Sequence, residues 1–305
     1  ERIDKKGKKE MRKFLGTALV VALSAACLAG CGSKGAEGTT AAGNGSAITV
    51  LSREDGSGTR GAFIELFGIQ EENESGEKVD MTTANAGITN STSVMMSSVA
   101  NDVNAIGYIS LGSLNDTVKA VKIDGAEASV ENVENGTYGI VRPFNIVVKE
   151  GEIKPVAQDF INYVMSADGQ AVVEDNGYIA VSDQPAFTSD NSEGKIVIGG
   201  SSSVSPVMEK LAEAYEQVNP KADVELQTTD STTGVSSTVE GSYDIGMASR
   251  EIKEEETAQG VVGMKIAQDG IAVVVNQENA QEELSSDQVK GIFTGEITTW
   301  DEVRK

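Results

Sequence analysis

Apolar and polar positions follow two periods along most of the chain. Short apolar runs of strand length, such as 47–51, 196–198 and 222–226, are each followed by segments whose apolar residues stand three or four positions apart. The first pattern is typical of strands and the second of amphipathic helices, and their alternation predicts sheets covered by helices on both faces. The clearest helix begins near Pro206, which suits a first helical turn. Its buried face is predicted to carry Val204, Val207, Met208, Leu211, Tyr215 and Val218, and Asn219-Pro220 to end it.

The same alternation divides the body of the chain into two α/β units. One unit, lobe A, is predicted to be continuous over 138–268. The other, lobe B, combines 47–137 with 269–305. Two strand-like segments, 144–148 and 270–276, are expected to cross between the lobes, and the second is apolar enough to be buried on both faces.

The stretch 52–60, Ser-Arg-Glu-Asp-Gly-Ser-Gly-Thr-Arg, places an arginine beside a glycine-rich turn between a strand and a helix. The first amides of a helix lack intrahelical partners and carry partial positive charge, so an oxyanion is favoured there. Ser57 and Thr59 add hydroxyl donors. Arg53 offers a planar fork of N–H groups, which Asp55 can orient. The alternative interpretation is an ordinary capped turn, because short glycine motifs often match by chance.

Two further segments repeat this chemistry. Ser201-Ser202-Ser203-Val204-Ser205-Pro206 follows one predicted strand, and Thr229-Asp230-Ser231-Thr232-Thr233-Gly234-Val235 follows another. Each segment alone is most simply a capped helix. Three hydroxyl-rich helix starts together with Arg53 favour a convergent ligand site.

The stretch 50–60, together with 106–111, 244–250 and 291–300, resembles the signatures of phosphate-binding proteins of bacterial ABC transporters. The resemblance covers 47–305 and implies a two-lobed, type II periplasmic binding protein fold, in which each lobe is a mixed sheet flanked by helices and two strands form the hinge. In that family the segment like 196–304 normally precedes the segment like 47–182, whereas here their order is exchanged. The chain therefore resembles a circular permutant, which is tolerable when the new termini lie at the surface.

The resemblance implies a phosphate site with one wall from each lobe. Contacts that bridge the lobes exist only in the closed state, so the ligand is expected to favour closure. The implied walls are Arg53, Ser57, Gly58 and Thr59, supported by Asp55, from lobe B, and Ser202, Ser203, Ser231 and Ser249 from lobe A.

Ser249 departs from the family pattern. Many members have an aspartate there that accepts a proton from hydrogen phosphate. Such a carboxylate rejects fully ionised sulfate, because like charges would meet in a poorly solvated cleft. Serine can donate or accept. We expect a site that still prefers phosphate through geometry and donor count, with Arg250 nearby.

By this resemblance the chain is an extracytoplasmic solute-binding lipoprotein that delivers inorganic phosphate to the membrane permease of an ABC importer. It is expected to act as a monomer, without cofactor or metal. Two alternatives stay open. One is a receptor for another tetrahedral oxyanion, such as sulfate, molybdate or tungstate, and the other is a surface lipoprotein without a transport role.

Composition limits the other classes of function. The 305 residues include 25 Lys and Arg, 47 Asp and Glu and no His, for a net charge of -22. The negative charge and the lack of a basic stripe with interleaved aromatics argue against nucleic-acid binding. The lack of histidine removes the commonest general base and the usual serine triad. No Ser-x-x-Lys stands at a helix start near the glycine turns, so no catalytic residue is predicted and the chain is not expected to be an enzyme.

The amino-terminal region sets the expected compartment. Residues 1–30 combine a basic stretch with an apolar run shorter than the roughly 20 residues of a spanning helix, which predicts a secretion signal, and Met11 is expected to be the true start. Leu28-Ala29-Gly30-Cys31 resembles a lipobox, which implies lipidation of Cys31 and anchoring at the outer face of the cell membrane. Residues 31–46, rich in Gly, Ala, Thr and Ser, are expected to form a flexible tether.

Overall fold

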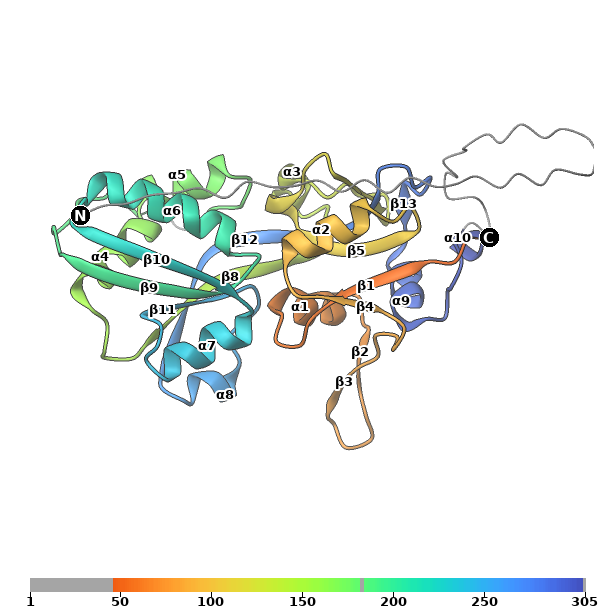
Figure 1. Ribbon diagram of the computed structural model, residues 1–305, viewed down its shortest axis with the longest axis horizontal. Coiled ribbons are helices and arrows are strands. Elements are labelled where there is room, and N and C mark those ends of the chain that lie inside the picture. The colour runs from red at the N-terminus through yellow and green to blue at the C-terminus, as the bar shows by residue number, and fades with distance from the viewer. Residues whose placement is uncertain (1–45, 182–183, 304–305) are drawn as a thin grey trace, which may run out of the picture. The chain divides into compact units, whose positions relative to one another are not determined.

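A nine-stranded mixed sheet forms the framework of the computed structural model, which describes residues 46–181 and 184–303 (Figure 1). The strand order is β10-β9-β11-β8-β12-β5-β1-β4, and β6 also pairs with β12. Strands β9, β10 and β11 run parallel, as do β1, β4 and β5, whereas β8 and β12 are antiparallel to their neighbours. The strands are β1 (Thr49–Arg53), β4 (Gly87–Thr89), β5 (Ala105–Ser110), β6 (Val118–Ala120), β8 (Val141–Lys149), β9 (Gly194–Ser201), β10 (Ala222–Thr229), β11 (Ile245–Ala248) and β12 (Val261–Asn276).

Helices cover this sheet, and two small two-stranded sheets accompany it. The hairpin of β2 (Gln70–Glu72) and β3 (Lys78–Asp80) is antiparallel, and β7 (Lys122–Ile123) pairs in parallel with β13 (Glu283–Leu284). The helices are α1 (Gly58–Leu66), α2 (Thr92–Ala100), α3 (Val130–Glu134), α4 (Pro155–Met165), α5 (Ala167–Asp175), α6 (Ser205–Val218), α7 (Ser231–Val239), α8 (Glu254–Thr257), α9 (Ser286–Thr294) and α10 (Trp300–Val303), with a 3₁₀ turn at Leu111–Ser113.

Two large hydrophobic cores and one small cluster, formed by Val147, Val235, Ala248 and Val261, lie along the sheet. The core of lobe B joins β1, β5, α1, α2 and α9 to the second half of β12, and includes the stacked rings of Phe63 and Tyr108. The core of lobe A joins β8, β9, β11, α4, α5 and α6 to the first half of β12. Figure 1 shows α5 and α6 on one side of β9 and β10, and α7 on the other. Each core buries the apolar faces that the helical spacing predicts.

The strands β8 and β12 connect the two cores. β12 pairs with β8 from Val261 to Gly270 and with β5 from Ile271 to Val275. All five side chains of the second stretch are fully buried, as expected of an apolar run without alternation. A crossing by two long strands leaves few backbone positions at which the lobes can pivot.

Most of the predicted helix after Pro206 is confirmed, because five of its six predicted apolar residues are fully buried. Val218 was predicted on the buried face but is 50% exposed, since it is the last residue of α6, next to the turn at Asn219. Tyr138 and Ile140, which the sequence prediction placed in lobe A, pack in the core of lobe B, where the Tyr138 hydroxyl donates to the Ile271 carbonyl at 2.7 Å.

The predictions for residues 1–45 lie outside the described residues. They comprise the signal, most of the tether and the lipidated Cys31. Among the residues that are described, no helix has the length and apolar character needed to cross a membrane.

Candidate anion site

The Arg53 side chain lies at the end of β1 and is 2% exposed. Its Nε and Nη2 donate to the two carboxylate oxygens of Glu54, both at 2.7 Å, and Nη2 also donates to Ser202 Oγ at 3.0 Å. Nη1 is buried and has no hydrogen-bond partner among the described residues. A buried guanidinium N–H without an acceptor is costly, so this atom marks a place where an anion would be stabilised.

The expectation that Asp55 orients Arg53 is wrong. The Asp55 carboxylate instead accepts from Arg60 at 2.7 Å, and its side chain is 99% exposed. The adjacent Glu54 reaches back to the guanidinium instead, and Gly56, at φ +86°, turns the chain two residues later. Glu54 is therefore the carboxylate that fixes the orientation of the Arg53 guanidinium.

The backbone of Arg53 is held from behind by Tyr108 on β5. The Tyr108 hydroxyl accepts the Arg53 N–H at 3.1 Å and bonds with Ser52 Oγ at 2.8 Å. Burial raises the pKa of Tyr108 to about 12, so the phenol stays neutral at physiological pH. The strand that carries the arginine is thereby tied to its neighbour by side chains as well as by the sheet.

The glycine turn of lobe B leads into α1 as expected. Ser57 caps the helix, its Oγ accepting the Arg60 N–H at 3.3 Å. Gly58 and Thr59 form the first turn of α1 and are buried. Thr59 Oγ1 lies 2.8 Å from Ser203 Oγ of lobe A. A Cβ on Gly58 would lie 2.4 Å from Ser231 Oγ and 2.7 Å from Ser249 Oγ, so only glycine allows this approach.

The four serines predicted for lobe A all lie in this cluster. Ser202 and Ser203 stand between β9 and α6, Ser231 begins α7, and Ser249 follows β11. All four are buried. The Ser249 N–H donates to Ser231 Oγ at 3.1 Å, so a hydrogen bond joins these two serines. The structure thus brings Thr59 together with the four serines of lobe A, whereas the Ser57 hydroxyl serves as a helix cap.

Three residues of the cluster are not among the predicted wall residues. Thr92 begins α2, and its Oγ1 lies 3.1 Å from Ser203 Oγ. Ser201 Oγ donates to Ser249 Oγ at 2.9 Å. The segment 89–93, Thr-Asn-Ser-Thr-Ser, carries the same hydroxyl-rich helix-start signal as the other three starts, so Thr92 was detectable from the sequence.

The third missed residue, Arg142, lies on the crossing strand β8. Its Nε and Nη2 donate to Asp269 on β12 at 3.3 and 3.1 Å, and both side chains are at most 1% exposed. Asp269 also accepts from Ser110 Oγ of lobe B at 3.0 Å, and Arg142 Nη1 donates to the Ser249 carbonyl at 3.3 Å. A buried ion pair therefore links the hinge strands to the candidate site.

Arg250, expected near the site, is largely occupied elsewhere. Its two terminal nitrogens donate to Glu256 at 2.8 and 2.7 Å. Burial alone would raise the pKa of Glu256, but hydrogen bonds from Arg250 and the Lys253 amide outweigh it and hold that pKa below its usual value. Arg250 Nη2 still reaches Thr232 Oγ1 at 3.4 Å, at the edge of the cluster.

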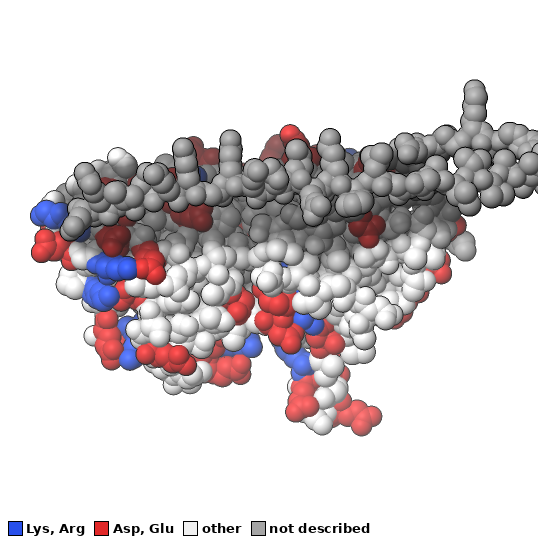
Figure 2. Space-filling view, viewed as in Figure 1, with Lys and Arg blue, Asp and Glu red and all other residues white. Residues whose placement is uncertain are grey.

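The cluster is a set of donors at the amino-terminal ends of α1, α2, α6 and α7. These helices have nine or more residues each, and their aligned dipoles place partial positive charge where the hydroxyl groups gather. On the face shown in Figure 2, Asp and Glu gather over α8 and the β2–β3 hairpin, and also beside α1. At contact distance the buried Arg53 and the helix ends outweigh screened surface carboxylates.

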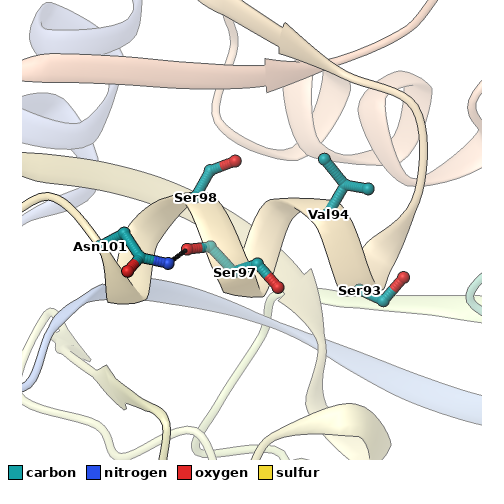
Figure 3. A pocket seen from close by; sticks show the side chains of 5 residues that line it. All are labelled: Ser93, Val94, Ser97, Ser98 and Asn101. Carbon is teal, nitrogen blue, oxygen red and sulfur yellow. Dashed lines mark hydrogen bonds between the residues drawn. The ribbon is translucent and has the colours of Figure 1, made fainter. Parts of the chain in front are cut away.

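A separate hollow of about 410 Å³ lies on the outer side of α2 (Figure 3). It is open and is lined by small polar side chains and a valine, and the Asn101 side-chain amide donates to the Ser97 carbonyl at 2.7 Å. Its lining contains no charged group that would hold an anion. No group of three or more Cys, Asp or Glu side chains within the described part of the chain is placed to bind a metal ion.

The fold and its buried donor cluster define a two-lobed solute-binding protein. Residues 33–168 and 185–305 match the PBP superfamily domain. Phosphate-binding protein PstS 2 of Streptococcus agalactiae serotype V is 58% identical over 258 residues, which are 85% of this chain and 88% of that protein. The crystal structure of a phosphate-binding protein of a phosphate ABC transporter from Streptococcus pneumoniae TIGR4 is 44% identical, covers 85% of this chain and 100% of its own, and superposes with a TM-score of 0.67. The chain belongs to the PstS family of phosphate-binding proteins.

The extent of these alignments bears on the order of the segments. PstS of Bacillus subtilis is 35% identical over only 116 residues, 37% of this chain and 39% of that protein. The exchanged order of the two segments stays a prediction, because the length of a match does not show which segments are aligned. PstS 2 of S. agalactiae aligns over most of both chains and therefore shares the order found here.

Proposed function

We propose that this protein captures inorganic phosphate between its two lobes and delivers it to the membrane permease of an ABC importer. The observation that carries the proposal is Arg53 Nη1, a buried guanidinium N–H without a partner among the described residues. It lies in a cluster where Ser202, Ser203 and Thr59 from opposite lobes are already within hydrogen-bond distance of one another or of Arg53. We choose phosphate among the oxyanions because the relatives are named phosphate-binding proteins.

In the proposed site the ligand is held by donors from both lobes. Arg53 supplies the charge, the first amides of α1 meet the anion through Gly58 and Thr59, and the serine hydroxyls complete the shell. The proposed ligand residues are Arg53, Ser57, Gly58, Thr59, Ser202, Ser203, Ser231 and Ser249, and we add Thr92 because its Oγ1 lies 3.1 Å from Ser203 Oγ. The protein binds its ligand without performing chemistry on it and works as a monomer.

The binding test is calorimetric titration of the full-length protein, purified in detergent and refolded free of ligand. Tight phosphate binding is expected. Arg53→Met is expected to weaken it at least about 30-fold, because removal of one partner of a buried charged contact costs 2 kcal/mol or more. Lys78→Met, an exposed site on the β2–β3 hairpin, removes the same charge without touching the cluster and should leave the affinity unchanged.

Other outcomes would redirect the proposal. Binding of molybdate, tungstate or sulfate without phosphate would indicate a receptor for another oxyanion. A protein that binds none of these anions would indicate a surface lipoprotein without a transport role.

We also propose that Cys31 carries the lipid that anchors the protein at the outer face of the cell membrane. The support is the apolar run that ends in Leu28-Ala29-Gly30-Cys31. Mass spectrometry of the mature protein should find an amino-terminal peptide that begins at Cys31 with an attached acyl lipid. An unmodified Cys31, or a mature chain that begins elsewhere, would contradict the anchor.

A further inference from the structure

A chain of hydrogen bonds with a fixed direction runs through the lobe A wall. The Ser203 N–H donates to Ser201 Oγ at 3.3 Å, and Ser201 Oγ donates to Ser249 Oγ at 2.9 Å. All three residues are at most 3% exposed. Ser201 has a single hydroxyl proton, and in this arrangement it is donated to Ser249. Ser249 Oγ is then left to donate its own proton onward.

The hydroxyl of Ser231, next to Ser249, also accepts a backbone N–H. Ser231 Oγ accepts the Ser249 N–H at 3.1 Å, and it is also within hydrogen-bond distance of Ser249 Oγ at 3.4 Å, with either hydroxyl as the donor, so at least one of the two protons remains available. Both oxygens face Gly58 at the start of α1. Arg142 fixes the backbone from the other side through the Ser249 carbonyl. The wall therefore presents protons toward the amino-terminal end of α1.

We propose that Ser201 determines specificity by holding Ser249 as a donor, so that this wall receives an oxyanion oxygen without a proton. The inference rests on the proposed phosphate site. A carboxylate at position 249 would do the opposite, since it accepts a ligand proton and repels an oxygen that has none. Sulfate, which carries no proton at neutral pH, is then admitted by this wall as readily as an unprotonated phosphate oxygen. Sulfate should compete with phosphate, more strongly than geometry and donor count alone would allow.

The test compares the dissociation constants of phosphate and sulfate for the full-length protein at one neutral pH. Sulfate is expected to bind within about tenfold of phosphate, a difference of about 1.4 kcal/mol or less. Ser201→Ala frees Ser249 to accept a proton from the ligand. The ratio of the sulfate to the phosphate constant should therefore rise about three- to tenfold, the worth of one hydrogen bond. Ser249→Asp should raise that ratio at least about 100-fold through like-charge repulsion.

Ser205→Ala is the matched control. Ser205 begins α6 and is buried, but its hydroxyl donates to the Ser201 carbonyl and accepts from Thr228 Oγ1, outside the directed chain. The ratio should not change in this variant, whose melting temperature also shows what loss of a buried hydroxyl at this helix start does to folding.

The results test two claims separately, the donor role of Ser249 and the proposed phosphate site. If phosphate binds tightly and sulfate binds more than about 1,000-fold more weakly, the proposed donor wall, in which Ser201 holds Ser249 as a donor, is wrong. The proposed phosphate site would not be affected by that result. An unchanged ratio in Ser201→Ala overturns the donor wall as well, and should that variant not fold, an unchanged ratio in Ser249→Asp does so. Sulfate binding without phosphate binding supports the donor wall and overturns the proposed function.

Discussion

At the scale of single residues, the candidate site depends on how Arg53 is fixed. The sequence identifies the arginine, but it offers two carboxylates, Glu54 and Asp55, as partners. The choice between them depends on the direction in which the chain leaves β1, and in the structure Glu54 contacts the guanidinium whereas Asp55 contacts Arg60. Residue types alone do not encode that direction. The buried acceptor behind Arg53, the Tyr108 hydroxyl, comes from a strand 55 residues away and is equally invisible to local patterns.

Tyr108→Phe is expected to lower the free energy of unfolding by about 1–3 kcal/mol, because it leaves the Arg53 N–H buried without its acceptor. Urea unfolding measures this loss. Tyr243→Phe is the control, since no hydrogen bond of the Tyr243 hydroxyl is found within 46–181 and 184–303. A loss below about 0.5 kcal/mol for Tyr108→Phe, or equal losses for both variants, would show that this hydroxyl contact is not important for stability.

At the scale of elements, the sequence predicts the parts of the site better than their arrangement. Hydroxyl-rich helix starts are local signals, and three of the four starts in the cluster were found, each directly after a strand. The start of α2 was missed because it has neither arginine nor glycine, although its serines and threonines carry the same signal.

The convergence of these helix starts is a property of the sheet. β1 and β4 are parallel neighbours, as are β9 and β10, so within each pair the carboxyl ends lie at one edge. α1, α2, α6 and α7 each begin just beyond such an end. Apolar spacing does not show which strands pair when they are distant in sequence. It does predict that β12 crosses between the lobes, because an unbroken apolar run requires burial on both faces.

At the scale of the whole described body, direct contacts already join the two lobes. Arg53 reaches Ser202, Thr59 meets Ser203, and the Gly56 carbonyl accepts from Thr232 N–H at 3.2 Å. The structure therefore shows a closed arrangement in which hydroxyl and amide groups of lobe A touch the glycine turn of lobe B. Closure of this kind requires that no side chain stand between Gly58 and the serines of lobe A.

Gly58→Ala should separate closure from folding. The added Cβ would lie 2.4 Å from Ser231 Oγ and 2.7 Å from Ser249 Oγ, so the closed state is obstructed, whereas the first turn of a helix accepts alanine when the lobes are apart. Phosphate affinity should fall at least about 100-fold, which corresponds to about 2.8 kcal/mol, with the melting temperature of the ligand-free protein little changed.

Gly61→Ala, on the same helix, provides the control for this substitution, because its Cβ would meet nothing closer than Arg250 Cδ at 4.0 Å. Small-angle scattering should show that phosphate makes the unchanged protein and Gly61→Ala more compact and has no such effect on Gly58→Ala. If Gly58→Ala binds phosphate with unchanged affinity and still becomes compact, the ligand does not require the close approach of α1 to Ser231 and Ser249. The bridging site proposed here would then have to be replaced by one confined to a single lobe.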